Sequence, residues 1–185
     1  MKKVLLDTYC GAGGCSVGYA RAGFHVVGVD AKPQPNYPYE FHQSDAIEFI
    51  HKHGHEFDVI HASPPCQKYS VAGKACQKVL GKEYPDLVDP TRQAILTVDR
   101  PYIIENVPGA PLRKDVVLYG HAFGLKVLRQ RWFEIGNGIW LMNPIIPPSK
   151  LRVNKGELVT VAGQGSSLRR LTGGGVRSAS IDLER

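Results

Sequence analysis

The chain has 185 residues, of which 43% are hydrophobic, enough for the core of one domain and too few for two domains of ordinary size. Its formal charge is +6, and most of the excess lies near the C-terminus, because residues 129–185 carry 9 Lys and Arg against 4 Asp and Glu. No apolar run approaches the roughly 20 residues that a membrane helix needs. These totals favour a soluble protein without a membrane span, and the basic C-terminal part favours either nucleic acid as a partner or a solvated surface.

The first 62 residues alternate between strand and helix patterns. Residues 3–8 form an apolar run of strand length, followed by the glycine-rich turn "CGAGG", a short helix over 15–22 and a second strand over 24–30. A proline-rich loop then leads to a helix over 45–53 and a strand over 57–62. Strands and helices that alternate at this spacing predict a parallel, doubly wound α/β sheet.

The second half continues the pattern and then loses it. A helix is expected over 90–99, and strands over 100–107, 116–120 and 129–136. From Asn143 onward, Pro, Gly and Ser dominate. We therefore expect a catalytic, cofactor-binding domain over 1–142 and a loop-rich basic extension over 143–185, either part of the same domain or an incomplete recognition region.

The four cysteines, Cys10, Cys15, Cys66 and Cys76, are expected to be free thiols. The apolar stretch at the N-terminus is too short for a secretory signal, which favours a cytoplasmic location and reducing conditions. No metal site is expected. The cysteine spacings match no zinc motif, and the histidines of "HKHGH" at 51–55 fit a solvated helix end better than a metal centre.

Three glycines and two acids mark a candidate nucleotide-binding site. The turn after the first strand of a parallel sheet usually holds a nucleotide-like ligand, and Gly11, Gly13 and Gly14 would let one approach the backbone closely. Asp30 ends the second strand, where an acid that binds ribose hydroxyls belongs, and Asp45 follows the next short segment. The turn lacks the third glycine of the dinucleotide motif, and so suits a nucleoside without pyrophosphate, such as S-adenosylmethionine. The alternative roles are a strand-end turn for Asp30 and a helix N-cap for Asp45.

Two further strand ends carry groups suited to covalent catalysis. Cys66 follows the strand over 57–62 and is preceded by Pro64 and Pro65, which would hold a nucleophilic thiolate in one place. Glu105 ends another apolar strand, and partial burial of a carboxylate raises its pKa, so that it can donate a proton near neutral pH. A thiolate and an acid on opposite edges of one ring would activate a poor carbon nucleophile.

Four stretches, in this order, resemble the DNA cytosine-5 methyltransferases: "DTYCGAGGCSVGY", "SPPCQKYS", "IIENV" and "LRQRWFE". The similarity covers roughly residues 3–135 and is closest to compact, phage-type members. It implies a Rossmann-like methyltransferase fold with a mostly parallel, doubly wound sheet, S-adenosylmethionine as the cofactor and DNA as the partner. Protection of DNA from restriction is one biological role that fits.

The resemblance also implies roles for individual residues. Cys66 would add to C6 of a cytosine while Glu105 hydrogen-bonds or protonates N3, and C5 would then take the methyl group. Asn106 would hold the loop, and Arg129 and Arg131 would contact the pyrimidine and brace the site. The target base would have to leave the duplex, at a cost of a few kcal/mol. The implied cofactor-binding residues are Asp7, Tyr9, Cys10, Gly11, Ala12, Gly13, Gly14, Asp30, Ala31, Asp45, Ala46, Ser63 and Pro64.

Two departures from the family pattern leave an alternative open. Val127 stands where the family usually has Gln, and no counterpart of the recognition region or of the late segment that closes the cofactor pocket is identified after residue 135. A short form is therefore expected, and a catalytically impaired protein that binds S-adenosylmethionine and DNA is the alternative function. A dinucleotide-dependent oxidoreductase fits the first turn alone and is disfavoured by the missing third glycine. The oligomeric state stays open.

Overall fold

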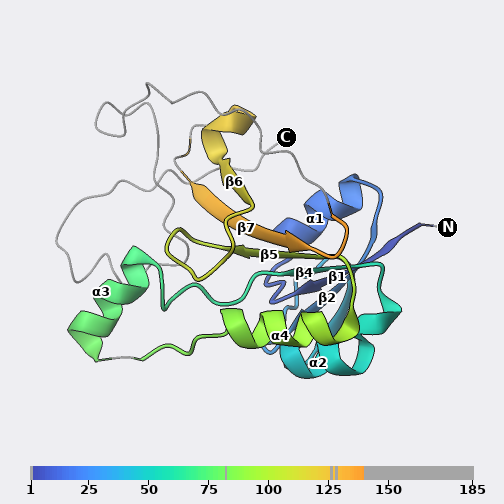
Figure 1. The fold of residues 1–185 in the computed structure, drawn as a ribbon, viewed down its shortest axis with the longest axis horizontal. Coiled ribbons are helices and arrows are strands. Elements are labelled where there is room, and N and C mark those ends of the chain that lie inside the picture. The colour runs from blue at the N-terminus through green and yellow to red at the C-terminus, as the bar shows by residue number, and fades with distance from the viewer. Residues whose placement is uncertain (1, 82, 126, 128, 140–185) are drawn as a thin grey trace.

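The computed structural model describes residues 2–81, 83–125, 127 and 129–139, so the expected extension over 143–185 lies outside the described residues. A seven-stranded sheet with the order β3-β2-β1-β4-β5-β7-β6 forms its centre (Figure 1). Strands β1 to β5 pair in parallel, and β7 pairs antiparallel with β5 and with β6. The predicted Rossmann-like, mostly parallel fold is therefore confirmed. The strands are β1 Val4–Thr8, β2 His25–Asp30, β3 Glu40–Gln43, β4 Val59–Ala62, β5 Tyr102–Asn106, β6 Val116–Tyr119 and β7 Gln130–Gly136.

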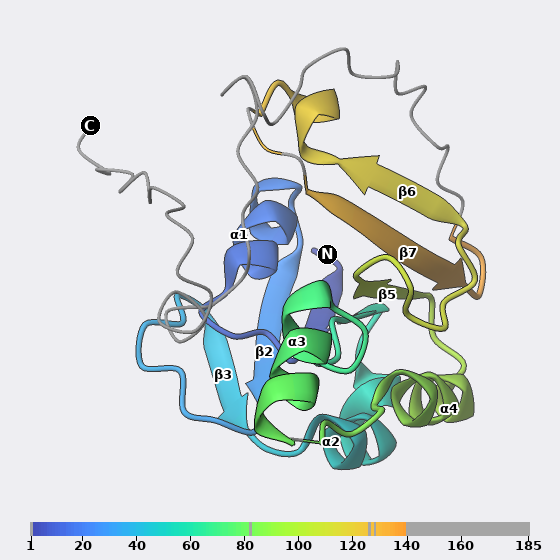
Figure 2. The ribbon, with the colours of Figure 1, turned by 90° about the vertical axis from the view of Figure 1, so that its left-hand side faces the viewer.

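The helices cover the two faces of the sheet unequally. Figure 1 shows α2 and α4 side by side below the strands and α1 above them. Helix α3 stands apart from the sheet at the left of Figure 1, the side that faces the viewer in Figure 2, where α3 is drawn in front of the strands. The α-helices are α1 Gly14–Arg21, α2 Ala46–His53, α3 Val71–Leu80 and α4 Val88–Val98, and the short 3-10 helices are η1 Gly54–Glu56 and η2 Gly120–Phe123. None of the helices among the described residues has the length and hydropathy to span a bilayer.

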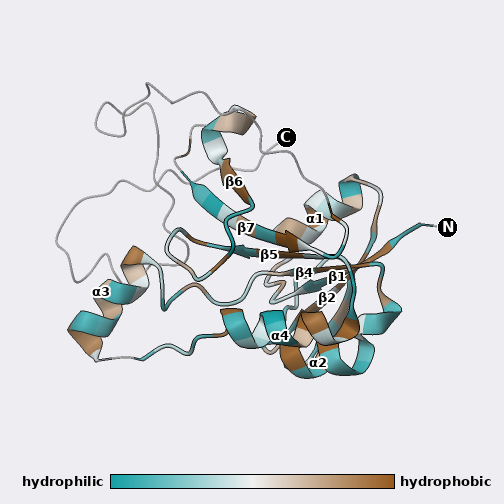
Figure 3. Cartoon of the chain, in the orientation of Figure 1, coloured by the Kyte–Doolittle hydropathy of each residue, from teal (hydrophilic) through white to brown (hydrophobic). Residues whose placement is uncertain are grey.

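One face of the sheet is packed by apolar side chains. Leu6, Ile60 and Ile104 alternate along their strands so that they point to this face, and each is fully buried. They contact the apolar sides of α2 and α4, where Ile50 and Ile95 are also fully buried. Figure 3 shows apolar residues concentrated on these two helices beneath the sheet. This face is the hydrophobic core that the alternating strand and helix patterns predict.

The opposite face, under α1, is polar at its centre. The strand register places Asp7 of β1 between Gly28 of β2 and His61 of β4, and both Asp7 and His61 are buried. Helix α1 supplies their partners: the hydroxyl of Ser16 donates to Asp7 Oδ2, and the hydroxyl of Tyr19 lies 2.9 Å from His61 Nδ1. Burial raises the pKa of Asp7 to about 6, while the Ser16 hydrogen bond offsets part of that rise. Burial lowers the pKa of His61 to about 4, so the imidazole is neutral at neutral pH.

Helix α3 was not among the expected elements. Its signals are nonetheless present, because the hydroxyl of Ser70 accepts a hydrogen bond from Gly73 N at 3.0 Å and Gly81, with φ +61°, ends the helix. Gly73 is required there, since a Cβ at this position would lie 1.7 Å from the carbonyl oxygen of Gln67. The helix therefore packs tightly against the chain that directly follows Cys66.

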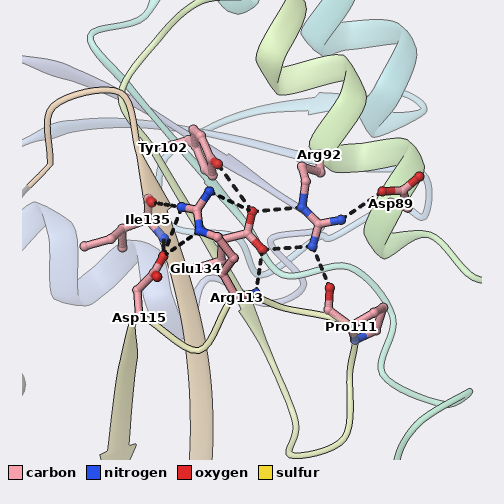
Figure 4. A network of polar contacts seen from close by, with 8 residues as sticks. All are labelled: Asp89, Arg92, Tyr102, Pro111, Arg113, Asp115, Glu134 and Ile135. Carbon is pink, nitrogen blue, oxygen red and sulfur yellow. Dashed lines mark hydrogen bonds and ion pairs between the residues drawn. The ribbon is translucent and has the colours of Figure 1, made fainter.

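A buried carboxylate anchors the antiparallel strand β7 (Figure 4). Glu134 has no exposed surface, and Arg92 of α4 binds it through two nitrogens, each 2.8 Å from a carboxylate oxygen. The backbone N–H of Arg113 donates to it at 2.9 Å, and the hydroxyl of Tyr102 donates at 3.3 Å. Burial opposes the charge, but the hydrogen bonds from Arg92 and Arg113 outweigh it and lower the pKa of Glu134. Helix α4, strand β5 and the loop before β6 are thus tied to one residue of β7.

Replacing Glu134 by Gln would leave the largely buried guanidinium of Arg92 without its main charged partner. We expect the free energy of unfolding, measured in urea at pH 7, to fall by about 3 kcal/mol. Asp89→Asn is the matched control, because Asp89 also pairs with Arg92 but is 64% exposed, and its loss should cost less than about 1 kcal/mol. Equal losses in the two variants would contradict the anchoring role of Glu134.

The raised pKa of Asp7 predicts a pH-dependent stability. A carboxyl whose folded-state pKa exceeds its unfolded value of 3.8 favours folding when protonated, and this contribution is lost as the pH rises through about 6. Between pH 4 and pH 7 the free energy of unfolding of the wild type should therefore fall relative to that of Asp7→Asn by roughly 2 kcal/mol. Groups that do not interact with Asp7 titrate alike in both proteins and cancel in the difference. A difference that stays constant with pH in urea titrations would show that Asp7 is not held in this way.

Candidate active site

The glycine-rich turn after β1 has one packed side and one open side. Backbone φ angles are positive at Tyr9 (59°), Gly11 (53°) and Gly13 (88°). A Cβ on Gly13 would lie 2.9 Å from Pro38 Cδ, so that side of the turn is closed. A Cβ on Gly11 or Gly14 would meet no atom of the described residues within 4 Å. The turn therefore presents backbone to open space on the side of Gly11 and Gly14, as a ligand cradle requires.

The two predicted acids both lie near this turn. Asp30 accepts hydrogen bonds from Gly11 N at 3.1 Å and from Lys32 N at 2.9 Å, and so joins the end of β2 to the turn. Asp45 caps α2 by accepting from the N–H groups of Ile47 and Glu48, so the N-cap alternative describes its structural role. Its charge also reaches Tyr9: burial first, and Asp45 in addition, raise the pKa of that phenol. Asp30 thus holds the turn and Asp45 holds the start of α2, and each carboxylate can still accept hydrogen bonds from a ligand.

Several predicted cofactor residues have side chains that face the protein interior. Asp7 is buried under α1, so its carboxylate bonds to Ser16 and does not face the open side of the turn. Cys10 is 8% exposed, and burial together with the charges of Asp7 and Asp30 raises the pKa of its thiol to about 12. The side chain of Ala46 is packed within the buried side of α2. Ala12 and Ala31, by contrast, are exposed at the ends of β1 and β2.

The loop that carries Cys66 is fixed at both ends. Before the thiol, Ser63 N donates to Thr8 O at 3.3 Å, and the carbonyl oxygen of Pro64 accepts from Asn106 Nδ2 at 2.9 Å. After it, Tyr69 N and Ser70 N donate to the carbonyl oxygen of Cys66 at 3.0 and 2.9 Å. Asn106 is buried and also accepts from Val107 N at 2.8 Å, so β5 holds the loop directly. The thiol itself is partly exposed.

Glu105 and Arg131 form an ion pair beside this loop. Arg131 Nε lies 2.8 Å from Glu105 Oε1, and both side chains are only about one-fifth exposed, at 20% and 23%. Burial and the neighbouring Arg131 lower the pKa of Arg129, whereas Glu105 and Cys66 act in the opposite direction. The thiol, the carboxylate and the two guanidinium groups are therefore within electrostatic reach of one another. The sequence suggested these four residues but not the ion pair, which depends on the register of β7 against β5.

A hollow of about 310 Å³ adjoins the ion pair. Glu105, Arg129 and Arg131 form its polar corner, and β6, η2 and β7 supply an apolar wall. The lining within the described part of the chain does not include Cys66 or the residues Gly11–Gly14. The hollow therefore lies beside the ion pair, and neither the thiol nor the turn lines it.

A polar cluster that the sequence patterns do not indicate lies under α1. The ligand-type atoms of Asp7, Cys15 and His61 lie within 4.8 Å of one another. His61 is already engaged, with Nε2 3.5 Å from Cys15 Sγ and Nδ1 2.9 Å from the hydroxyl of Tyr19. Burial raises the pKa of the Cys15 thiol, which is accordingly neutral at physiological pH. The members come from β1, α1 and β4, so no local spacing in the sequence could have indicated the cluster.

Solved structures of low sequence identity share the fold. The S. pombe Dnmt2 methyltransferase superimposes with a TM-score of 0.52 at 17% identity, covering 78% of this chain and 52% of that one. A DNMT2 mutant from Spodoptera frugiperda gives a TM-score of 0.51 at 19% identity, covering 88% of this chain and 56% of that one. At these identities the similarity establishes the fold alone.

Relatives with higher sequence identity identify the family of this chain. The type II methyltransferase M.HgiDI of Herpetosiphon aurantiacus is 30% identical over 163 residues, which cover 71% of this chain and 51% of that protein. The type II methyltransferase M1.HphI of Haemophilus parahaemolyticus is 31% identical over 129 residues, covering 58% of this chain and 33% of that protein. The chain thus spans about half the length of M.HgiDI and a third of M1.HphI. Residues 4–116, more than half of the chain, match the family model of the C-5 cytosine-specific DNA methylases, and the chain belongs to that family.

Proposed function

We propose that the protein transfers a methyl group to C5 of cytosine in DNA, with S-adenosylmethionine as the methyl donor. The observation that carries this proposal is the ion pair between Glu105 and Arg131 beside the fixed loop of Cys66. Membership of the C-5 cytosine-specific DNA methylase family and the methyltransferase names of the relatives support it. The oxidoreductase alternative has no support in these similarities.

The glycine-rich turn fits the proposed cofactor. Its open side at Gly11 and Gly14 exposes backbone to a ligand, Asp30 supplies a carboxylate at the turn, and the charge of Asp45 reaches Tyr9. When bound, S-adenosylmethionine supplies an electrophilic methyl group. The hydrogen bond between Ser63 and Thr8 joins the Cys66 loop to the end of β1, so the thiol and the turn belong to one rigid edge of the sheet. This edge is where parallel α/β sheets bind their ligands.

Cys66 would act as the nucleophile toward cytosine. Its thiolate forms a bond to C6, and the electron pair of the C5–C6 double bond moves toward C5 and N3. Glu105 faces N3 and stabilises the ring by hydrogen bonding or protonation, while Arg131 holds Glu105 by its Oε1 atom. C5 would then attack the methyl group that S-adenosylmethionine supplies, with the thioether S-adenosylhomocysteine as the leaving group. Transfer of the C5 proton to water would expel the Cys66 thiolate and restore the double bond.

DNA would reach these groups only with the target base out of the helix. A cytosine in a duplex hides C5 and C6 in the base stack, and extrusion costs a few kcal/mol. Arg129, beside the ion pair, is placed to neutralise a phosphate or to contact the pyrimidine. The formal charge of +6 favours such a polyanionic partner.

Covalent trapping tests the proposed chemistry. DNA that contains 5-fluorocytosine has no C5 proton to lose, so after methyl transfer the Cys66 adduct should persist on a denaturing gel with labelled S-adenosylmethionine. We expect a covalent band with the wild type and with Cys76→Ala, and none with Cys66→Ala, because Cys76 lies in α3 outside the site. A band of equal intensity with Cys66→Ala would refute the mechanism. Binding of cofactor and DNA without any band from the wild type would instead support the catalytically impaired alternative.

A further inference from the structure

The connection between β2 and β3 has no helix. Parallel neighbours are usually joined by a crossover of a dozen or more residues that contains one. Here residues 31–39 suffice, and a right-handed crossover places them on the same face of the sheet as α1. Some other group must therefore cover that face of β2, next to the glycine-rich turn.

Tyr37 covers it. A Cβ added to Gly28 of β2 would lie 2.2 Å from Tyr37 Cζ, so the ring rests directly on the backbone of this strand. The ring centroid of Phe41 in β3 lies 5.6 Å away, and the register places Phe41 next to Gly28. Gly28 in turn neighbours Asp7 in β1. The ring thus fills the place of the missing helix and ends beside the buried carboxylate.

The hydroxyl of Tyr37 is the outer end of a hydrogen-bond chain. It lies 2.8 Å from Ser16 Oγ, and Ser16 donates its own proton to Asp7 Oδ2. A serine hydroxyl has one proton, so Tyr37 is the donor to Ser16 whenever Asp7 is ionised. Burial raises the pKa of Tyr37, which keeps that proton on the phenol. The chain links the loop of residues 31–39, the first turn of α1 and the centre of β1.

The loop of residues 31–39 also packs against the glycine-rich turn. A Cβ on Gly13 would lie 2.9 Å from Pro38 Cδ and 3.1 Å from the Tyr37 ring, whereas the Gly11 side of the turn is open. Tyr9, Gly11 and Gly13 all have positive φ angles, a conformation that a non-glycine residue such as Tyr9 adopts only when its surroundings impose it. Tyr37 and Pro38 form the surface against which this conformation is held.

We propose that Tyr37 is a positioning residue for the cofactor turn: its ring and its hydroxyl, through Ser16 and Asp7, hold the turn in its binding conformation before the cofactor arrives. The proposal rests on the proposed function in its choice of ligand. A turn ordered in advance binds more tightly, because binding does not have to supply the free energy of ordering it. Without the contacts of Tyr37, part of the population would leave the binding conformation. The apparent affinity for the cofactor would then fall in proportion to the fraction that remains in it.

Tyr37→Phe removes the hydroxyl and keeps the ring. We expect calorimetry to show about a fivefold to tenfold weaker affinity for S-adenosylmethionine, the effect of one hydrogen bond, with unchanged affinity for a DNA duplex. Tyr39→Phe is the matched control, because Tyr39 loses the same atom from the same loop and should bind the cofactor as the wild type does. A purely structural role would lower the melting temperature without this selective loss of cofactor affinity.

A second readout needs no ligand. In hydrogen exchange of the free protein, the amides of residues 9–14 should exchange faster in Tyr37→Phe than in Tyr39→Phe. Gly28→Ala should enlarge both effects, because its Cβ displaces the ring. Identical exchange and affinity in Tyr37→Phe and Tyr39→Phe would overturn the proposal. A wild type that fails to bind S-adenosylmethionine would contradict the proposed function, whereas the exchange comparison would still decide whether Tyr37 holds the turn.

Discussion

The site depends on the register of one antiparallel strand. Strand β7 enters between β5 and β6, and its pairing with β5 is what brings Arg131 to within 2.8 Å of Glu105. A slip of one residue would turn Arg131 to the other face of the sheet. Glu134, three residues further on, prevents the slip, because its buried carboxylate satisfies donors from α4, β5 and the loop before β6 at once. The ion pair of the site and the anchor of the sheet therefore belong to the same strand, on opposite faces.

Different interactions hold the helices on the two faces of the sheet. Below, α2 and α4 bury apolar side chains, and stability comes from area removed from water. Above, α1 is held by hydrogen bonds to Asp7 and His61, and Tyr37 replaces a helix. Buried polar groups contribute little net stability but demand specific partners in specific places. Such groups suit the face that carries the glycine-rich turn. There the conformation of the backbone matters for ligand binding, and a large contribution to the free energy of unfolding is not needed.

The alternating strand and helix patterns, the glycine-rich turn and the loop of Cys66 could be predicted because each is encoded within about ten consecutive residues. Helix α3 was missed although Ser70 and Gly81 mark its ends and its apolar residues Val71, Ala75 and Val79 follow helical spacing. In the structure Val71 and Val79 are exposed, so this apolar side is not part of the core. The ion pairs could not be predicted: Arg92 and Glu134 are 42 residues apart, and their contact exists only after the sheet has formed. Asp7 was expected near the cofactor from the motif alone, yet tertiary burial under α1 determines its chemistry. The division into residues 1–142 and 143–185 stays a prediction.

The proposed function assigns the methylation of C5 of cytosine to the edge of the sheet formed by the glycine-rich turn, Cys66 and Glu105. The most direct measurement is mass spectrometry of nucleosides from unmethylated genomic DNA after incubation with the protein and S-adenosylmethionine carrying a deuterated methyl group. We expect deuterated 5-methyldeoxycytidine as the single new nucleoside from the wild type, and none from Cys66→Ala. Deuterated N4-methylcytosine or N6-methyladenine, or equal yields of 5-methyldeoxycytidine from the wild type and Cys66→Ala, would contradict the proposed function.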